Sequence, residues 1–375
     1  MNTARDRVAI ILTAAIFGLT YGLSAPLIAL QLSDAGLAET LIGLNAAMHA
    51  LGVLLIAPFL PGLTAWLGMG RTALLALVMA AAVLALFPAV PGLWLWFPLR
   101  LALGIASESL FVVSETWVNQ ITTEEVRARS MAAYTASLSL GFALGPVVLT
   151  FSGSAGAQPF LLGSLIALAA AALLLLMRPR PAAIERPPSM TPLRALRLAP
   201  LAIAATALNA ALETAGLSFL ALYAMGLGWT ERPATLLIST LMTGAILLQL
   251  PIGWLGDRFD RRRLTLILAI LSTVGAGLWP AVLATPWLTY PLLFLWGGAF
   301  VGIYTLMITL LGSRFQGGEL VGLYAILSVS WGIGALLGPP LGGAAMQVAT
   351  HGLPVFAAAG CAALAFFVAF SRSRS

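Results

Sequence analysis

The sequence PIGWLGDRFDRRRL, residues 251–264, joins two long apolar segments through a short and highly charged turn. It holds two aspartates and four arginines, whereas only 9% of the 375-residue chain is charged and 60% is hydrophobic. Soluble domains average about 25% charged residues, so this composition does not suffice to cover a water-facing surface. The turn therefore lies between two membrane-spanning segments of an integral membrane protein.

The chain contains twelve apolar segments bounded by charges or by Pro/Gly turns. They lie near residues 8–32, 40–60, 72–90, 94–117, 129–150, 158–177, 199–226, 233–255, 264–284, 288–311, 319–345 and 352–370. A helix needs roughly 20 apolar residues to cross the hydrocarbon core, and it satisfies its own backbone hydrogen bonds there. We therefore expect an all-α membrane protein with twelve transmembrane helices.

The distribution of arginine indicates the orientation. All 19 basic residues are arginines, and all but Arg100 and Arg232 lie at the termini or in loops on one side of the predicted spans. Basic loops mark the cytoplasmic side, so both termini are expected in the cytoplasm. This asymmetry accounts for the net charge of +6 without a nucleic-acid partner.

Similar segments recur at a nearly constant offset. TYGLS at 20–24 matches TAGLS at 214–218, GFALGP at 141–146 matches GALLGP at 334–339, and Pro58 matches Pro251. These positions give offsets of 194, 193 and 193 residues. We therefore expect two six-helix halves, 1–177 and 199–375, joined by a cytoplasmic linker at 178–198, as in transporters with parallel repeats.

The charged turn resembles the signature G-x-x-x-D-R-x-G-R-R of the major facilitator superfamily. The matching residues are Gly253, Asp257, Arg258, Arg261 and Arg262, with Asp260 in the place of a glycine. The first-half counterpart at 61–72 is degenerate, because it keeps Gly68 and Arg71 but has no acid. The resemblance covers essentially the whole chain and implies a secondary active transporter.

The resemblance also implies a role for the charged turn as a cytoplasmic latch. It places Asp257 near the start of the fifth span, beside Arg127 and Arg129, where free helix N–H groups favour an anion. Ion pairs made in only one conformation would bias closure on the cytoplasmic side. The alternative is that the arginines only keep the loop inside.

The fourth predicted span carries charge deep in the membrane. Arg100, Gly104, Glu108, Phe111 and Glu115 fall on one face of a helix, which we expect to line a water-filled cavity. Arg100 with Gly104 resembles the family's R-x-x-x-G motif, which implies proton coupling. We take Glu108, Glu213, Arg100 and Glu115 as candidate proton-coupling residues, although Glu115 could instead pair with arginines at the cytoplasmic end.

The fifth and eleventh predicted spans share a glycine motif. Its members are Gly141, Gly145 and Pro146 in the first half and Gly334, Gly338 and Pro339 in the second. The first copy partly resembles the G-x-x-x-G-P element of proton-driven exporters, which favours export. Close helix packing through small residues is the alternative explanation.

Other polar and aromatic residues are candidates for a substrate cavity. They are Tyr21, Asn45, His49, Asn209, Gln249, Tyr304, Tyr324 and Trp331. Asn45 with His49, and Asn209 with Glu213, are spaced i, i+4 and so share a helix face. For the aromatic residues, helix packing or anchoring at the membrane interface is the alternative.

These features predict a proton-coupled exporter of a small organic solute, amphipathic or cationic, acting as a monomer in the bacterial inner membrane. The alternatives are a proton symporter for uptake, a lipid translocase and a transporter-like sensor. An enzyme is disfavoured because the chain has one cysteine, two histidines and no H-E-x-x-H motif. We expect no metal and no cofactor, and ATP drive is disfavoured because a phosphate-binding G-x-x-x-x-G-K-[ST] loop is missing.

Overall fold

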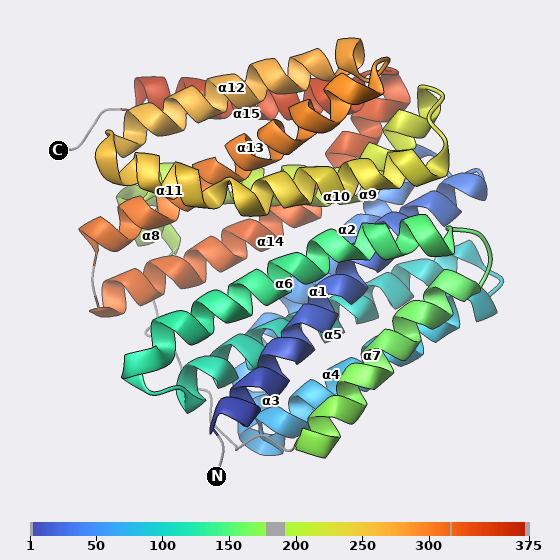
Figure 1. Ribbon diagram of the computed structural model, residues 1–375, viewed down its shortest axis with the longest axis vertical. Helices are drawn as coiled ribbons and strands as arrows, with labels where there is room; N and C mark the ends of the chain where they lie inside the picture. Colours follow the sequence, from blue (N-terminus) through green and yellow to red (C-terminus); the bar gives the residue numbers. More distant parts are fainter. Residues whose placement is uncertain (1–2, 178–191, 316, 372–375) are drawn as a thin grey trace. The chain divides into compact units, whose positions relative to one another are not determined.

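The computed structural model describes residues 3–177, 192–315 and 317–371, and in this part of the chain helices are joined by short turns and loops (Figure 1). The first helices are α1 (Thr3–Asp34), α2 (Glu39–Ile56), α3 (Leu60–Leu67), α4 (Met69–Leu86), α5 (Trp96–Ile121), α6 (Glu124–Ser152) and α7 (Gln158–Met177). The later ones are α8 (Pro192–Leu198), α9 (Pro200–Gly226), α10 (Glu231–Leu247), α11 (Gln249–Arg258), α12 (Arg261–Val282), α13 (Pro286–Arg314), α14 (Gly317–Val348) and α15 (Gly352–Phe370). Short 3-10 turns occupy Ala57–Phe59, Phe87–Ala89 and Leu93–Leu95.

Within the described residues, 12 helical segments are long and apolar enough to cross a membrane. The expected all-α protein with twelve membrane-spanning helices is therefore confirmed. The second span is longer than predicted and reaches Leu67. Most of the predicted linker, 178–191, lies outside the described residues, and its last part forms the short helix α8.

Two of the spans are interrupted at related positions. The second span changes from α2 to α3 through the 3-10 turn that contains Pro58, and the eighth breaks at Leu248, three residues before Pro251. Proline has no N–H for the helical hydrogen bond, and its ring crowds the preceding turn, so it favours a break at this place. Pro26 and Pro146, by contrast, lie within continuous helices. The shared break supports the internal repeat.

The described chain forms two compact units. The first comprises 1–37, 45–186 and 231–239, and the second comprises 38–44, 187–230 and 240–375. In the first unit, α1 packs along α6, and α4 packs against α5 and α7 (Figure 1). In the second unit, α9 packs along α14, and α12 packs against α13 and α15. The predicted boundaries of the two halves at 177 and 199 remain a prediction.

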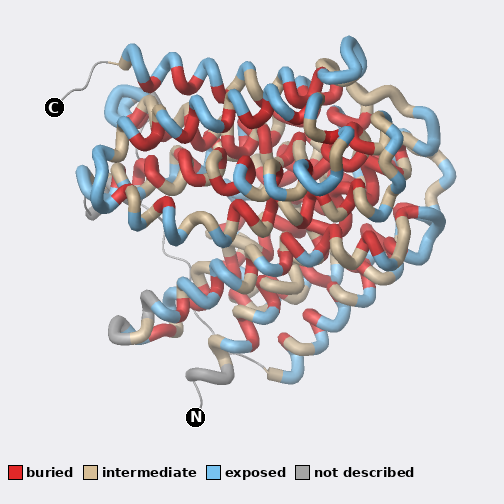
Figure 2. Tube along the Cα trace, turned by 45° about the horizontal axis from the view of Figure 1, so that its top comes forward, coloured by how far each residue is buried: buried red, intermediate tan, exposed pale blue. Residues whose placement is uncertain are grey.

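Burial alternates along most helices, so each presents one covered and one open face (Figure 2). Many open positions are large and apolar, and Trp66 and Leu250 are about four-fifths exposed. Lipid tails are as apolar as these side chains, so their exposure is expected in a membrane protein.

The glycines of the repeated motif lie where two helices meet closely. A Cβ atom on Gly141 would lie 2.1 Å from the carbonyl oxygen of Ala15, and one on Gly334 would lie 2.0 Å from that of Ala207. Gly145 and Gly338 meet the α1 and α9 backbones in the same way. Only glycine permits this approach, which explains the tight α1–α6 and α9–α14 pairs.

Candidate transport site

Arg100 of α5 is a fully buried cation in the first unit. Its side chain is 2% exposed, and its Nη1 donates a long hydrogen bond of 3.5 Å to the carbonyl oxygen of Ser24 on α1. Its Nε has no hydrogen-bond partner. Tyr21 of α1 and His49 of α2 are its electrostatic neighbours, and no carboxylate within the described residues forms an ion pair with it.

Two polar residues of α2, Asn45 and His49, lie one helical turn apart, and His49 is an electrostatic neighbour of Arg100. Both are buried, and Asn45 Nδ2 and His49 Nδ1 have no hydrogen-bond partner. The ring of Tyr21 packs on His49, with centroids 4.7 Å apart. Gly104 brings α2 and α5 together, because a Cβ there would lie 2.0 Å from the carbonyl oxygen of His49. We call Arg100, His49 and Asn45 the donor cluster.

The predicted polar stripe of α5 therefore divides into two parts. Arg100 and Gly104 pack against α2 rather than line a cavity, whereas Glu108, Phe111 and Glu115 remain partly exposed. The physical reason is Gly104, whose missing side chain lets the α2 backbone cover this end of the stripe. The neighbouring void, lined by Tyr21, Ser24 and Ser107 among others, has a volume of about 10 Å³, enough for about one water molecule.

The partly exposed end of the stripe has a partner that sequence reasoning missed. Tyr134 of α6 is buried, its hydroxyl lies 2.9 Å from Ser114 Oγ, and it donates to the carbonyl oxygen of Phe111. It interacts electrostatically with Glu108 and Glu115. A tyrosine within an apolar span was the available signal, but its facing helix was not known.

The second unit places its acid on α9. Asn209 Nδ2 donates to Glu213 Oε2 at 3.4 Å, as their spacing predicted, while Asn209 Oδ1 is buried without a partner. No ion pair joins Glu213 to a basic residue in the part of the chain that the structure describes. The structure thus places an acid without an ion-pair partner in this unit.

Gln249, at the helix break, is tied into the second unit. Its Nε2 donates to the carbonyl oxygen of Ala245, and its Oε1 accepts from Thr305 of α13, a residue not predicted from the sequence. Tyr304 and Trp331 are half-buried and Tyr324 is exposed. Roles for Tyr304, Tyr324 and Trp331 in a substrate cavity remain predictions.

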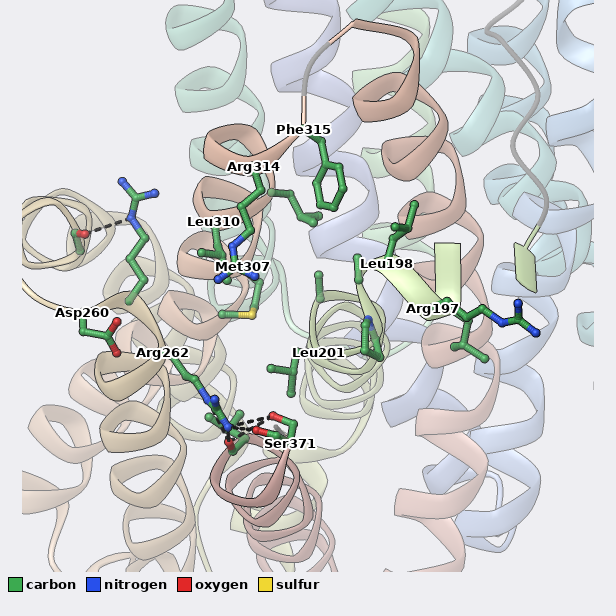
Figure 3. Close-up of a pocket in the computed structure, with 18 of the residues that line it drawn as sticks. Arg197, Leu198, Leu201, Asp260, Arg262, Met307, Leu310, Arg314, Phe315 and Ser371 are labelled. Atoms are coloured by element: carbon green, nitrogen blue, oxygen red, sulfur yellow. Dashed lines mark hydrogen bonds between the residues drawn. The ribbon is translucent and has the colours of Figure 1, made fainter. Parts of the chain in front are cut away.

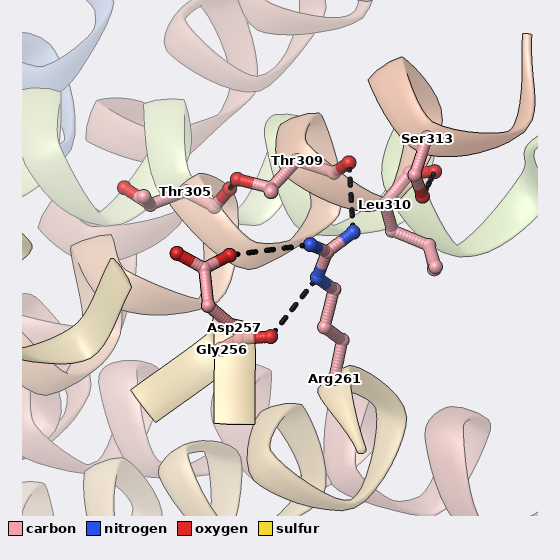
Figure 4. Close-up of polar contacts among 7 residues, drawn as sticks. All are labelled: Gly256, Asp257, Arg261, Thr305, Thr309, Leu310 and Ser313. Carbon is pink, nitrogen blue, oxygen red and sulfur yellow. Dashed lines mark hydrogen bonds and ion pairs between the residues drawn. The ribbon is translucent and has the colours of Figure 1, made fainter. Parts of the chain in front are cut away.

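The charged turn is organised around Arg261 (Figure 4). Its guanidinium donates to the carbonyl oxygens of Gly256 and Thr309 at 3.0 and 3.3 Å, and to Asp257 Oδ1 at 3.4 Å. This arginine therefore joins the ends of α11, α12 and α13. Asp257 is 72% exposed, and its approach to Arg127 and Arg129 remains a prediction, because the side chain of Arg127 lies outside the described residues.

The other residues of the turn have separate structural partners. Asp260 accepts from the backbone N–H of Arg263 at 2.8 Å and so caps α12, which explains an aspartate where the signature has glycine. Arg262 donates to the carbonyl oxygens of Val368 and Ser371 at the end of α15. Arg258 lies over the Trp254 ring, 4.0 Å from its centroid, and a Cβ on Gly253 would point into open space.

A cavity of about 1150 Å³ lies beside this turn within the second unit (Figure 3). Its charged lining consists of Arg197, Arg261, Arg262, Arg314, Asp257 and Asp260. Arginines therefore outnumber acids around it, which suits the arginine-rich side of the predicted topology. Within the described residues, no group of three or more His, Cys, Asp or Glu side chains could hold a metal ion.

The sequence profile described as Major Facilitator Superfamily matches residues 10–236 and 202–375. The chain belongs to this superfamily. Its members are secondary transporters of small molecules and not enzymes, so this multi-pass protein is a membrane transporter. The membership of the superfamily that the charged turn suggested is thereby confirmed.

Curated relatives and solved structures agree with this assignment. The Bacillus subtilis protein "Uncharacterized MFS-type transporter YfkF" is 26% identical over 90% of this chain and 88% of its own length. "Uncharacterized MFS-type transporter YcaD" of Salmonella enteritidis is 25% identical over 86% and 84%. The crystal structure of the nucleoside transporter NupG has a TM-score of 0.77 and 16% sequence identity, and the match covers 100% of both chains. The crystal structure of the D-xylose-proton symporter has a TM-score of 0.76 and 14% sequence identity, and the match covers 97% of this chain and 96% of the symporter. Both structures share the fold.

Proposed function

We propose that this transporter couples the movement of a small organic solute to protons, by alternating access between two six-helix halves. The observation that carries the proposal is a pair of acids, Glu108 and Glu213, in apolar helices without a cationic partner among the described residues. Charged groups within a membrane are costly and mark ion or proton pathways. Glu115 and Tyr134 extend the path from Glu108 toward the C-terminal end of α5.

Export is the direction that the GFALGP motif favours, and uptake by symport is the second candidate. The glycines of this motif are accounted for by packing in both units, which removes the argument that the motif gave for export. The motif therefore gives little information on direction. Translocation of a labelled lipid, or ligand binding without flux, would instead support a translocase or a sensor.

We place the protein as a monomer in a bacterial inner membrane, with both termini and the linker in the cytoplasm. The arginine asymmetry of the loops supports this orientation. The bacterial source of the relatives supports the type of membrane.

The test uses purified protein in liposomes that contain a pH-sensitive dye. Candidate solutes are added with and without an imposed pH gradient, and solute-dependent proton movement is recorded. We expect Glu108→Gln or Glu213→Gln to lower gradient-driven accumulation at least tenfold while solute exchange continues, because the amide keeps the shape of the side chain but cannot bind and release a proton near neutral pH.

The matched control is Glu319→Gln, since Glu319 forms an exposed ion pair with Arg194. This variant should transport like the wild type. If both Glu108→Gln and Glu213→Gln also retain wild-type accumulation and pH dependence, proton coupling through these acids is wrong, and Asn45 with His49 becomes the next pair to examine.

A further inference from the structure

We propose that the donor cluster binds an anionic group of the transported solute, of the carboxylate or phosphate class. The inference rests on the proposed function, since it takes the solute to be a small organic molecule, and it adds the charge of that molecule. It also departs from the sequence-based expectation of a cationic solute.

The first argument is charge balance around Arg100. A buried ion is costly unless a partner of opposite charge compensates it, and its removal from water costs several kcal/mol even after relaxation. Arg100 is 2% exposed, and its one hydrogen bond is a long contact to a neutral carbonyl group. Within the described residues, the protein therefore buries a cation whose neutralising partner it does not supply.

The described groups around Arg100 include no acid close to it. From α1 come the Tyr21 ring and the Ser24 carbonyl, and from α2 comes His49. On its own helix the nearest acid is Glu108, two turns away, about 12 Å along the axis. The electrostatic neighbours of Glu108 are Glu115 and Tyr134.

The second argument is the type of atom left without a partner. Arg100 Nε and Asn45 Nδ2 are N–H donors, and His49 Nδ1 is a donor in one tautomer and in the imidazolium form. Asn45 and His49 are 1% and 5% exposed. Buried polar atoms are nearly always hydrogen-bonded, so a set of unpaired donors calls for an acceptor. Carboxylate and phosphate oxygens accept several hydrogen bonds and carry the charge that Arg100 lacks.

The structure shows this site in a closed form. Gly104 keeps the α2 backbone against α5, and the small void beside Tyr21 and Ser24 is not lined by any residue of the donor cluster. A solute group reaches Arg100 only when these helices part. An alternating-access transporter supplies such a state.

The first test needs no substrate. An arginine that awaits an anion is a strained element of the empty protein, whereas a structural arginine stabilises it. We therefore expect purified Arg100→Gln to have a melting temperature equal to or above that of the wild type in low-salt buffer. The exposed Arg263→Gln serves as control and should leave the melting temperature unchanged.

The second test adds sodium benzoate, sodium phosphate and sodium chloride at equal ionic strength. We expect benzoate or phosphate to raise the wild-type melting temperature by about 2 °C or more above chloride. Arg100→Gln should lose this shift, and Arg100→Lys should keep a smaller one, because lysine retains the charge without the planar fork.

Three outcomes overturn the inference: a destabilised Arg100→Gln with no anion effect on the wild type, an equal shift in both proteins, and a response to chloride alone. Proton-coupled flux that persists without any specific anion effect would remove the anion site and leave the proposed function standing. An anion effect that depends on Arg100, in a protein without proton-coupled flux, would support the anion site and contradict the proposed proton coupling.

Discussion

The two units use the same packing contacts but hold different polar groups. In the first, Gly104 of α5 packs against the carbonyl oxygen of His49 on α2, and an added Cβ atom would lie 2.0 Å from that oxygen. In the second, Gly297 of α13 abuts the carbonyl oxygen of Leu241 on α10, at 2.2 Å. The two glycines are related by the 193-residue offset of the repeat.

The polar residues do not follow this repeat. At the same offset, Asn45, His49 and Arg100 correspond to Ile238, Met242 and Leu293, all of which are buried and apolar. Conversely, Glu213 corresponds to Leu19 at the offset of 194. One unit thus buries a cation, and the other carries an acid for which the described residues supply no ion-pair partner.

This difference between the two units distinguishes the glycines, which serve helix packing, from the polar residues, which do not. Helices that cross at the same distance need small residues at the same places, so the glycines recur in both halves. A charge inside a membrane is costly, so it is kept where it has a use and replaced by an apolar side chain elsewhere. Polar residues that depart from the repeat are therefore the better candidates for transport.

The largest expected effect breaks the shared packing. Gly141→Ala and Gly334→Ala should each reduce the yield of folded, monodisperse protein at least fivefold, because the new methyl group meets backbone that cannot move aside. Size-exclusion chromatography with fluorescence detection measures the yield.

Gly216→Ala on α9 is the control for both glycines. No atom lies within 4 Å of a Cβ at this position, and alanine is the better helix former. Wild-type yields for both Gly141→Ala and Gly334→Ala would show that packing is not what the repeat preserves.

A smaller effect tests the charged turn, which has an acid in only one copy. Asp257→Asn should slow transport about two- to fivefold with normal expression, since it weakens one exposed contact to Arg261 and the predicted latch. Arg71→Gln, in the copy without an acid, should stay within about 1.5-fold of the wild type. Flux into liposomes over a pH series compares the two, and equal behaviour would reduce Asp257 to a topology residue.

The smallest effect concerns a surface charge pair of the second unit. Arg194 and Glu319 lie 2.9 Å apart with exposed side chains, and such pairs contribute roughly 0–1 kcal/mol. Arg194→Gln should therefore change the melting temperature by no more than about 2 °C and leave transport unchanged. A larger drop in melting temperature would mean that charged residues of the second unit other than Glu213 and the charged turn contribute to its stability.

The sequence by itself determined the twelve helices, because hydropathy is a local property. A run of about 20 apolar residues must be helical in lipid wherever it packs. The i, i+4 spacing likewise placed Asn209 within hydrogen-bonding reach of Glu213. Proline alone did not decide the breaks, because Pro58 and Pro251 lie at breaks whereas Pro26 and Pro146 lie within continuous helices. For the motif glycines, the sequence left open a resemblance to the exporter element and close helix packing as the alternative.

Only the tertiary structure decided which side chains meet across helices. Three contacts depend on how the helices cross. Arg100 lies beside His49 rather than an acid, Tyr134 lies near Glu108, and Arg261 reaches the backbone of α13. A shift of one helix by one turn, about 5.4 Å, would change every such pair without altering any hydropathy pattern. Contacts of about 3 Å are therefore set by packing between segments distant in the chain, which the local pattern of residues does not encode.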